Sequence, residues 1–244
     1  MSRIVRSGLV AALCLLASAC ANLGEKRENA SSSLVSYLYG KDGVPRTPPP
    51  AGYSYRLPAT VGLAFVPAAL SSGGMPLPEA LKNQLLEQVK AAFSNRPFIG
   101  EIKIVPEAYL RSGESGFQNI EQLSRMYGFD VVALLSYDQL SVSTQKNASL
   151  LYWTLAGAYV IKGDRNDVST FVDTAVFDVA TRKLMFRAPG VDQSSASATL
   201  IENPRVLNET RQQGFSLATR DMIRHLDAAV TAFHEAREQA RSQN

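Results

Sequence analysis

Residues 59–66 read Ala-Thr-Val-Gly-Leu-Ala-Phe-Val, and this short apolar run decides the fold. Its length, its β-branched and aromatic content and the Pro67 that ends it are typical of a buried strand. In residues 78–93, apolar residues recur at spacings of three and four with charges between them, and Pro78 suits a first helical turn. Together the two stretches predict a strand followed by a helix.

The pattern continues downstream with a second and a third strand. Residues 99–105 alternate as a strand, residues 117–127 have helical spacing, and Gly128 is a plausible C-cap for that helix. Residues 131–136 then form another buried apolar run. The order strand, helix, strand, helix, strand predicts a parallel half of a sheet.

Beyond residue 137 the strands follow one another with only turns between them. Residues 138–145, 150–162 and 169–179 are predicted strands, and 163–167 is a predicted hairpin connection. Asp178–Phe186 reads as strand, tight turn, strand. These segments predict an antiparallel half of the same sheet.

A long helix over 208–241 closes the chain, because its apolar residues fall three and four apart and need a sheet to cover. Residues 235–244 have only alanines to bury, so we expect this polar tail to fray. The fold class is therefore α/β (α+β), with a mixed sheet and a long C-terminal helix. The globular domain is predicted over 59–234.

The N-terminus has the form of a bacterial lipoprotein signal. Arg3 and Arg6 precede an apolar stretch over 8–17, and small residues lead directly to Cys20. The apolar stretch has about half of the roughly 20 residues that a membrane-spanning helix needs. We therefore predict a signal peptide over 1–19 and lipidation of Cys20. The alternative is an ordinary secretory signal that leaves Cys20 as a free thiol.

Cysteine usage favours lipidation. Cys14 leaves with the signal, so Cys20 is the single cysteine of the mature chain and has no partner for an internal disulfide. Acylation would cap a thiol that an oxidising compartment exposes to unwanted chemistry. Inner-membrane lipoproteins commonly carry Asp after the cysteine, whereas this chain has Ala21 and Asn22. The lipoprotein maturation and sorting machinery is thus expected to deliver it to the outer membrane.

Composition limits the possible partners. Loss of Arg3 and Arg6 lowers the basic count from 25 to 23 against 22 acidic residues, so the mature chain is nearly neutral. No stretch concentrates Lys and Arg with interleaved aromatic residues, so nucleic acid is not an expected partner. The 45% hydrophobic content is enough for one folded domain of ordinary size.

Residues 20–58 are predicted to be a lipidated tether with a Pro-rich linker. Within them, residues 34–39 hold five apolar residues in six. One interpretation is a docking peptide exposed on the tether. The other is a short helix packed back on the domain, since so much apolar surface is costly to leave in water.

The search for catalytic chemistry yields no complete motif. A Ser-His-acid site is not favoured, because His225 and His234 are nine residues apart on one helix, and Ser115 lacks the second glycine of a nucleophile elbow. Glu107 and Glu114 are possible acid–base partners that nothing in the sequence brings together.

Cofactor and metal motifs are incomplete as well. Residues 71–74, Ser-Ser-Gly-Gly, lack the Lys-Ser/Thr of a phosphate loop. Asp164, Asn166 and Asp167 lack the downstream glutamate of a calcium loop. We therefore predict no catalytic residues, no cofactor and no metal site.

Three blocks of sequence resemble the rhombotarget lipoprotein family, which is associated with bacteria that encode rhombosortase. They are residues 32–39, 61–67 and 177–190. The resemblance supplies no catalytic residues. The rhombosortase target itself is a Gly-Gly pair, an apolar segment and a basic tail, and residues 238–244 contain neither the glycine pair nor the apolar segment. By element order alone, the chain also resembles periplasmic lipoproteins of the curli-secretion-channel and penicillin-binding-protein-activator types, and the N-terminal domain of TolB.

The leading hypothesis is a non-enzymatic outer-membrane lipoprotein, held in the membrane by Cys20, that binds an unknown envelope or export protein. The expected contact surface combines residues 34–39 with Ala188-Pro189-Gly190. Two alternatives stay open. One is a hydrolase with an unrecognised site, and the other is a subunit of an oligomeric secretion channel, for which residues 150–162 are the suggestive segment.

Overall fold

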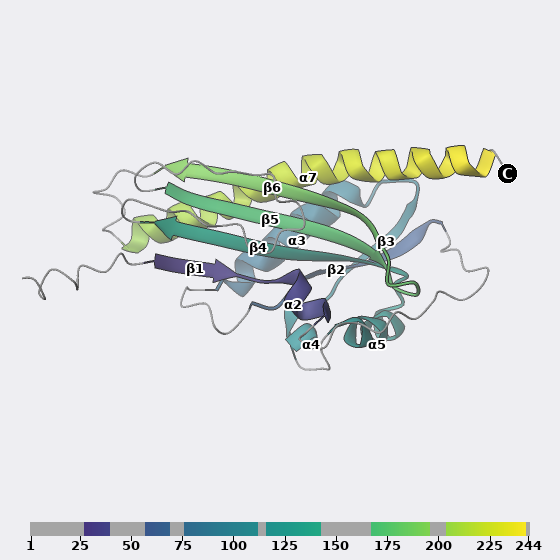
Figure 1. Ribbon diagram of the computed structural model, residues 1–244, viewed down its shortest axis with the longest axis horizontal. Helices are drawn as coiled ribbons and strands as arrows, with labels where there is room; N and C mark the ends of the chain where they lie inside the picture. The colour runs from purple at the N-terminus through teal and green to yellow at the C-terminus, as the bar shows by residue number, and fades with distance from the viewer. Residues whose placement is uncertain are drawn as a thin grey trace, which may run out of the picture.

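The computed structural model describes residues 27–39, 57–68, 76–111, 116–142, 167–195 and 204–242, and these form three layers (Figure 1). The strands are β1 (Arg27–Ser31), β2 (Ala59–Phe65), β3 (Ile99–Ile104), β4 (Val131–Val142), β5 (Asp167–Asp178) and β6 (Leu184–Ser195). The helices are α2 (Leu34–Tyr39), α3 (Glu79–Phe93), α4 (Glu107–Arg111), α5 (Phe117–Tyr127) and α7 (Pro204–Ser242). The predicted mixed α+β fold is confirmed.

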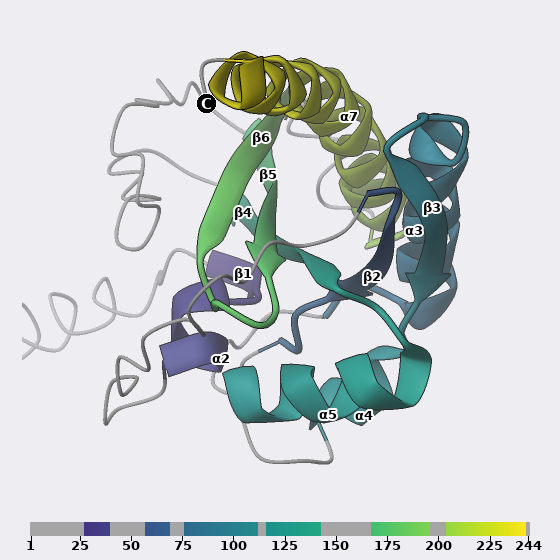
Figure 2. The same ribbon diagram turned by 90° about the vertical axis from the view of Figure 1, so that its right-hand side faces the viewer.

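The sheet has a parallel and an antiparallel half, as the element order predicts. Its strand order is β3-β2-β4-β5-β6, with β1 paired separately to β4. β2 runs parallel to both β3 and β4, and β4, β5 and β6 run antiparallel in succession. Parallel neighbours require crossover connections. α3 lies in the first crossover, and α4 and α5 lie in the second (Figure 2).

The structure corrects the predicted bounds of the strand β4. The sequence predicts two strands divided at residue 137, but β4 is one strand of 12 residues. β2 pairs with its first part, Val131 to Leu135, and β1 pairs with its second part, Asp138 to Val142. Residues 27–31 were predicted as part of the tether, and they instead form this additional strand. The sheet therefore begins seven residues after Cys20.

The C-terminal helix is longer than predicted. α7 begins at Pro204 and continues through the expected fraying tail to Ser242, giving 39 residues, or about 58 Å at 1.5 Å per residue. Its C-terminal part extends past the end of the sheet (Figure 1). No described helix has the length and apolar character that a membrane crossing requires. The predicted strand 150–162, the signal peptide 1–19 and Cys20 lie outside the described residues.

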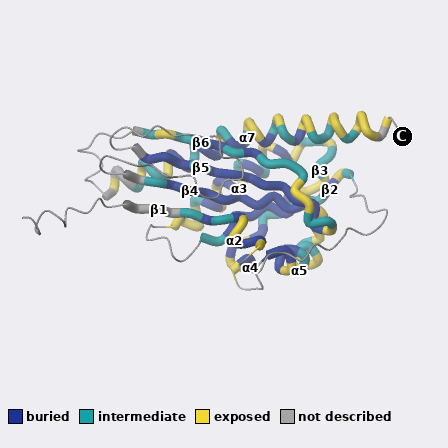
Figure 3. Tube along the Cα trace, viewed as in Figure 1, coloured by how far each residue is buried: buried dark blue, intermediate teal, exposed yellow. Residues whose placement is uncertain are grey.

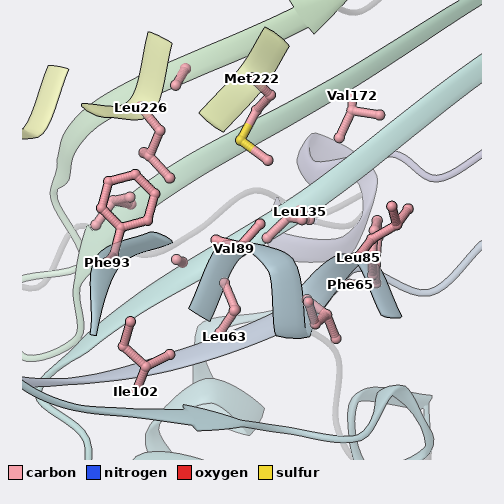
Figure 4. Packing of buried hydrophobic residues seen from close by; sticks show 14 of the residues in the cluster. Leu63, Phe65, Leu85, Val89, Phe93, Ile102, Leu135, Val172, Met222 and Leu226 are labelled. Carbon is pink, nitrogen blue, oxygen red and sulfur yellow. The ribbon is translucent and has the colours of Figure 1, made fainter. Parts of the chain in front are cut away.

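The core lies on both faces of the sheet because side chains alternate along each strand. In β2, Leu63 and Phe65 join the cluster under α3 and α7, whereas Ala64 belongs with Val66 to the cluster under α2, α4 and α5. Buried residues follow the strands through the middle of the molecule (Figure 3). Figure 4 shows part of the first cluster, where Leu85 of α3 and Met222 of α7 approach the sheet.

α7 also protects an edge of the sheet. β6 has no neighbour on its outer side among the described strands, and such edges invite pairing with other chains. The backbone N–H of Val191 donates to Asp221 Oδ2 at 3.1 Å, and His225 Nδ1 donates to the carbonyl oxygen of Pro189 at 2.6 Å. Two side chains of α7 thus form hydrogen bonds with backbone groups in the middle of this edge strand.

Candidate functional site

The predicted contact surface separates into a buried and an exposed part. Ala188 is fully buried, and Gly190 lies directly against the backbone of α7. The interpretation of residues 188–190 as a docking surface is therefore wrong, because α7 covers this stretch of β6. Residues 34–39 form α2, which packs back on the domain as the second interpretation predicts.

Specific contacts fix α2 in place. Leu34, Tyr37 and Leu38 are buried, and the Tyr37 hydroxyl accepts a hydrogen bond from Asn119 Nδ2 of α5 at 3.2 Å. Burial raises the pKa of Tyr37 to about 12, and the hydrogen bond from Asn119 opposes this. Gly116 begins α5 with φ of 85° beneath the carbonyl of Leu38, a conformation that favours glycine. Gly116 is thus the N-cap residue of α5.

The other side of α2 borders a groove. Val35 and Tyr39 of α2 and Leu184 of β6 line it, and they are three of the five exposed large apolar side chains among the described residues. We call this feature the α2 groove, lined by Leu34, Val35, Leu38, Tyr39, Ser136, Asp173, Ala175, Phe177, Leu184 and Arg187. Clustered exposed apolar side chains are typical of interaction sites.

Polar groups lie at the floor of the α2 groove. Ser136 is 1% exposed, and its hydroxyl has no hydrogen-bond partner within the described part of the chain. Beside it, Arg187 Nε contacts both carboxylate oxygens of Asp173 at 2.7 Å. Burial raises the pKa of Asp173, and the charge of Arg187 opposes this. The groove thus has apolar walls over a buried hydroxyl and an ion pair that is already matched.

Asp138 is the next residue of β4 on the same face as Ser136, and it is also buried. Its Oδ1 has no partner among the described residues, and burial raises its pKa to about 6, against a weaker opposing hydrogen bond from the Gln139 backbone. Sequence analysis missed Ser136 and Asp138 because polar residues at a strand end resemble the start of a turn. Both residues continue the every-second-residue spacing of Val132 and Leu134, and this spacing could have indicated that they lie on the same buried face.

The raised pKa predicts an unusual pH dependence of stability. Folded Asp138 holds its proton to a higher pH than the unfolded chain does, so the free energy of unfolding falls as pH rises from about 4 to about 6. We expect Asp138→Asn to stabilise the protein at pH 8 by up to about 3 kcal/mol, at 1.36 kcal/mol per pKa unit. Below pH 3.5 the difference should vanish. Urea unfolding at both pH values measures it, and an equal effect at both would contradict the burial of this carboxyl.

A second buried polar cluster lies beyond the carboxyl ends of β2 and β3. Lys82 Nζ forms an ion pair with Glu107 Oε2, and both side chains are 3% exposed. The exposed Glu79 and Arg111 extend the cluster, with contacts from Glu79 Oε1 to Lys82 Nζ at 3.2 Å and to Arg111 Nη2 at 2.9 Å. The two cations and two carboxylates match one another, so the network fastens α4 to α3.

This network contains one of the two carboxylates that the sequence offered as acid–base partners. Glu107 is held by Lys82, a residue that the sequence analysis did not identify, and Glu114 lies outside the described residues. Lys82 precedes Leu85, Leu86, Val89 and Phe93 on the buried stripe of α3. The helical spacing that places Lys82 on that stripe was the feature of the sequence that could have indicated its burial.

The remaining candidates do not form a catalytic constellation in the described residues. Ser115, residues 71–74, Asp164 and Asn166 lie outside them, and no group of metal-binding side chains occurs within them. His225 binds the edge of β6, whereas the ring of His234 packs on Phe98 with centroids 4.9 Å apart. The two histidines serve different contacts on α7.

A second hollow lies on the opposite face of the sheet from the α2 groove. It is a cavity of about 100 Å³ between the parallel strands, α3 and the C-terminal part of α7, which we call the α3–α7 cavity. Val61 and Leu63 of β2 and Phe93 of α3 belong to its walls. His234 and Arg237, both on α7, are the only ionisable residues of its described lining.

No protein-family model matches the sequence, and comparison with curated proteins gives no match. Solved structures show distant likeness. A PelC dodecamer from Paraburkholderia phytofirmans is 11% identical with a TM-score of 0.33, over 83% of this chain and 96% of that one. Protein XCC0632 from Xanthomonas campestris, of family DUF330, is 10% identical with a TM-score of 0.34, over 80% and 95%. Lipoprotein GNA1162 from Neisseria meningitidis is 12% identical with a TM-score of 0.29, over 64% and 96%. At these TM-scores, no property of those proteins is transferred to this chain.

Proposed function

We propose that this chain is an outer-membrane lipoprotein of rhombotarget type, anchored through Cys20, whose folded domain binds another envelope protein through the α2 groove. The anchor is supported by the signal sequence and by Cys20 as the single mature cysteine. The observation that carries the binding proposal is the gathering of Val35, Tyr39 and Leu184 around one groove.

The position of β1 supports a partner near the membrane. Seven residue steps separate Cys20 from Arg27, and they span at most about 25 Å when fully extended. Since β1 is part of the sheet and α2 follows it after two residues, a lipidated Cys20 would keep α2 within about 50 Å of the bilayer, the extended length of the 14 residue steps to Leu34. Ser32 reinforces this link, because its N–H donates to the carbonyl of Tyr137 at 2.8 Å.

The chemistry of the α2 groove favours binding over catalysis. Apolar walls gain free energy when a partner removes them from water. The hydroxyl oxygen of Ser136 has almost no accessible surface, and no imidazole or thiol belongs to the described lining that could activate this serine. We therefore propose a partner segment that inserts apolar side chains into the α2 groove.

Charge substitution tests the docking site. Val35→Glu, made in the native lipoprotein, is expected to lower recovery of the co-purified envelope partner at least about tenfold, because a desolvated charge costs more than the 1.4 kcal/mol that corresponds to this factor. Met126→Glu is the matched control, since Met126 is an exposed apolar residue on α5 outside the groove. Quantitative mass spectrometry of both eluates measures the effect. Equal recovery from a folded Val35→Glu protein would reject the α2 groove as the docking site.

A further inference from the structure

The strand β3 ends the sheet on the side opposite β6 (Figure 2). Among the described strands, only β2 pairs with it. Side chains of α7 form hydrogen bonds with the edge of β6, whereas the described residues form no such bonds with the outer edge of β3. Gly100 and Glu101 of β3 are exposed. The fold therefore protects one edge of the sheet and leaves β3 open to pairing with another strand.

The backbone of β3 presents hydrogen-bonding groups along its open edge. The N–H of Val105 donates to the carbonyl of Leu63 at 2.9 Å, on the side of β2. Backbone groups of successive residues alternate between the two sides of a strand. The N–H and C=O groups of Ile102 and Ile104 therefore point away from β2, where they can form a ladder with a further strand.

The charges on β3 decide which strand fits this edge. Glu101 and Lys103 lie two residues apart and so share one face of the sheet. Their side chains form an ion pair of 3.3 Å and are 62% and 31% exposed. Lys103 Nζ also donates to the carbonyl of Tyr127 at 2.8 Å, which holds it over the end of α5. Charged side chains usually prevent pairing at an edge, but this pair has opposite signs, so an antiparallel copy of β3 presents the complementary order.

We propose that β3 pairs antiparallel with β3 of a second copy of this chain, about a two-fold axis at Ile102, and so joins the two sheets. In this register, Ile102 lies opposite Ile102 of the second copy, and the two residues exchange backbone hydrogen bonds. Glu101 lies opposite Lys103 of the second copy, at the positions where side chains of opposite strands are closest. Each charge keeps the partner in its own chain and gains one of opposite sign across the axis.

The size of this contact predicts a reversible dimer. Pairing along one short edge strand buries less than the roughly 1,200 Å² at which stable protein interfaces begin. The two-fold axis uses the same edge on both copies, so the assembly closes at two chains and forms no filament. No residue of β3 belongs to the described lining of the α2 groove. The two proposals can therefore fail independently.

Analytical ultracentrifugation of the mature full-length chain, carrying Cys20→Ala so that it is free of lipid, tests the dimer. We expect a monomer–dimer equilibrium between micromolar and millimolar concentrations. Glu101→Lys should raise the dissociation constant at least about tenfold, because it creates two like-charge contacts across the axis. Glu209→Lys is the matched control, since Glu209 is also 62% exposed and paired within its own chain, but lies on α7. A natural chain that stays monomeric, or an unchanged dissociation constant for folded Glu101→Lys, would overturn the proposal.

Mixing two variants separates pairing across the axis from the ion pair within each chain. Lys103→Glu should dimerise as poorly as Glu101→Lys does. In an equimolar mixture, the introduced lysine of one chain lies opposite the introduced glutamate of the other, so the mixture should form a heterodimer. A defect confined to each chain would not be repaired by mixing. A folded mixture that stays monomeric would reject the proposed register.

Disulfide crosslinking tests the same register without charge reversal. Opposite residues at positions without hydrogen bonds have Cα atoms about 4.5 Å apart, within the range of about 4.4–6.8 Å that a disulfide spans. In the Cys20→Ala chain, which has no other cysteine after removal of the signal, a mixture of Glu101→Cys and Lys103→Cys chains should crosslink under oxidised glutathione. Glu101→Cys alone should crosslink far less, because position 101 lies opposite position 103. Equal yields from the mixture and from Glu101→Cys alone would contradict the two-fold axis at Ile102.

Discussion

Gly190→Ala is expected to destabilise the domain by at least about 3 kcal/mol, at the upper end of overpacking effects. An alanine Cβ at this position would lie 2.6 Å from Met222 Cβ, and closer still to the carbonyl oxygen of Ala218 and the amide nitrogen of Met222. Two of these three atoms belong to the helix backbone, so no side-chain rotation relieves the overlap. α7 would have to move away from β6, which exposes apolar surface on both.

Gly100→Ala provides the control for that measurement. Gly100 lies in β3, where the nearest atom to an added Cβ is 3.5 Å away, an ordinary contact distance. Its free energy of unfolding should change by less than about 1 kcal/mol. Urea unfolding of both variants gives the comparison. A change below 1 kcal/mol for Gly190→Ala would show that α7 does not pack on β6 as described.

Lys82→Met is expected to cost about 3–5 kcal/mol, the usual effect of removing one partner of a buried ion pair. The variant leaves the 3% exposed carboxylate of Glu107 with Arg111 Nη2 at 3.2 Å as its remaining cation. The free-energy cost of burying the Glu107 carboxylate is then only partly offset by the remaining cation. The double variant Lys82→Met/Glu107→Leu should recover most of the loss, because it removes both charges.

Substitution of the exposed Arg111 in the same network provides a comparison for Lys82→Met. Arg111 is 54% exposed, so Arg111→Gln should cost no more than about 1 kcal/mol. A double-mutant cycle over Lys82 and Glu107, measured by chemical unfolding, gives the coupling between them. Additive effects of the two single substitutions would show that this pair does not form in solution.

The alternation of strands and helices could be predicted because each element carries its own periodicity. β2 is apolar throughout, and α3 and α5 show a repeat of three and four. β1 could not be predicted, since its sequence Arg-Glu-Asn-Ala-Ser has no apolar alternation. A strand of this kind forms through backbone pairing with β4, and that partner lies more than a hundred residues away.

The C-terminal tail and β4 differ from their predictions for separate reasons. The tail beyond residue 234 was expected to fray for lack of burial, yet Glu, Ala, Arg and Gln are strong helix formers and continue α7 without it. β4 was divided because Ser136 and Asp138 interrupt an apolar run. Their burial depends on pairing with β1 and β5, which local sequence does not show.

The residues of the candidate site were predicted only in part. The apolar content of residues 34–39 correctly indicated a packed helix, but Leu184 and Ser136 join the α2 groove through tertiary structure alone. The same holds for the α3–α7 cavity, whose lining comes from strands and helices distributed over most of the described chain. The anchor at Cys20 stays a prediction from sequence.

Photo-crosslinking from Tyr39 in intact cells tests the central claim most directly. A photoreactive residue at position 39 of the lipoprotein, which carries Cys20, is compared with the same residue at position 109, since Tyr39 and Tyr109 are similarly exposed, at 39% and 47%. We predict one discrete adduct with an envelope protein from position 39, recovered in the outer-membrane fraction, and none from position 109. Adducts of equal yield from both positions, or none from position 39, would contradict docking through the α2 groove.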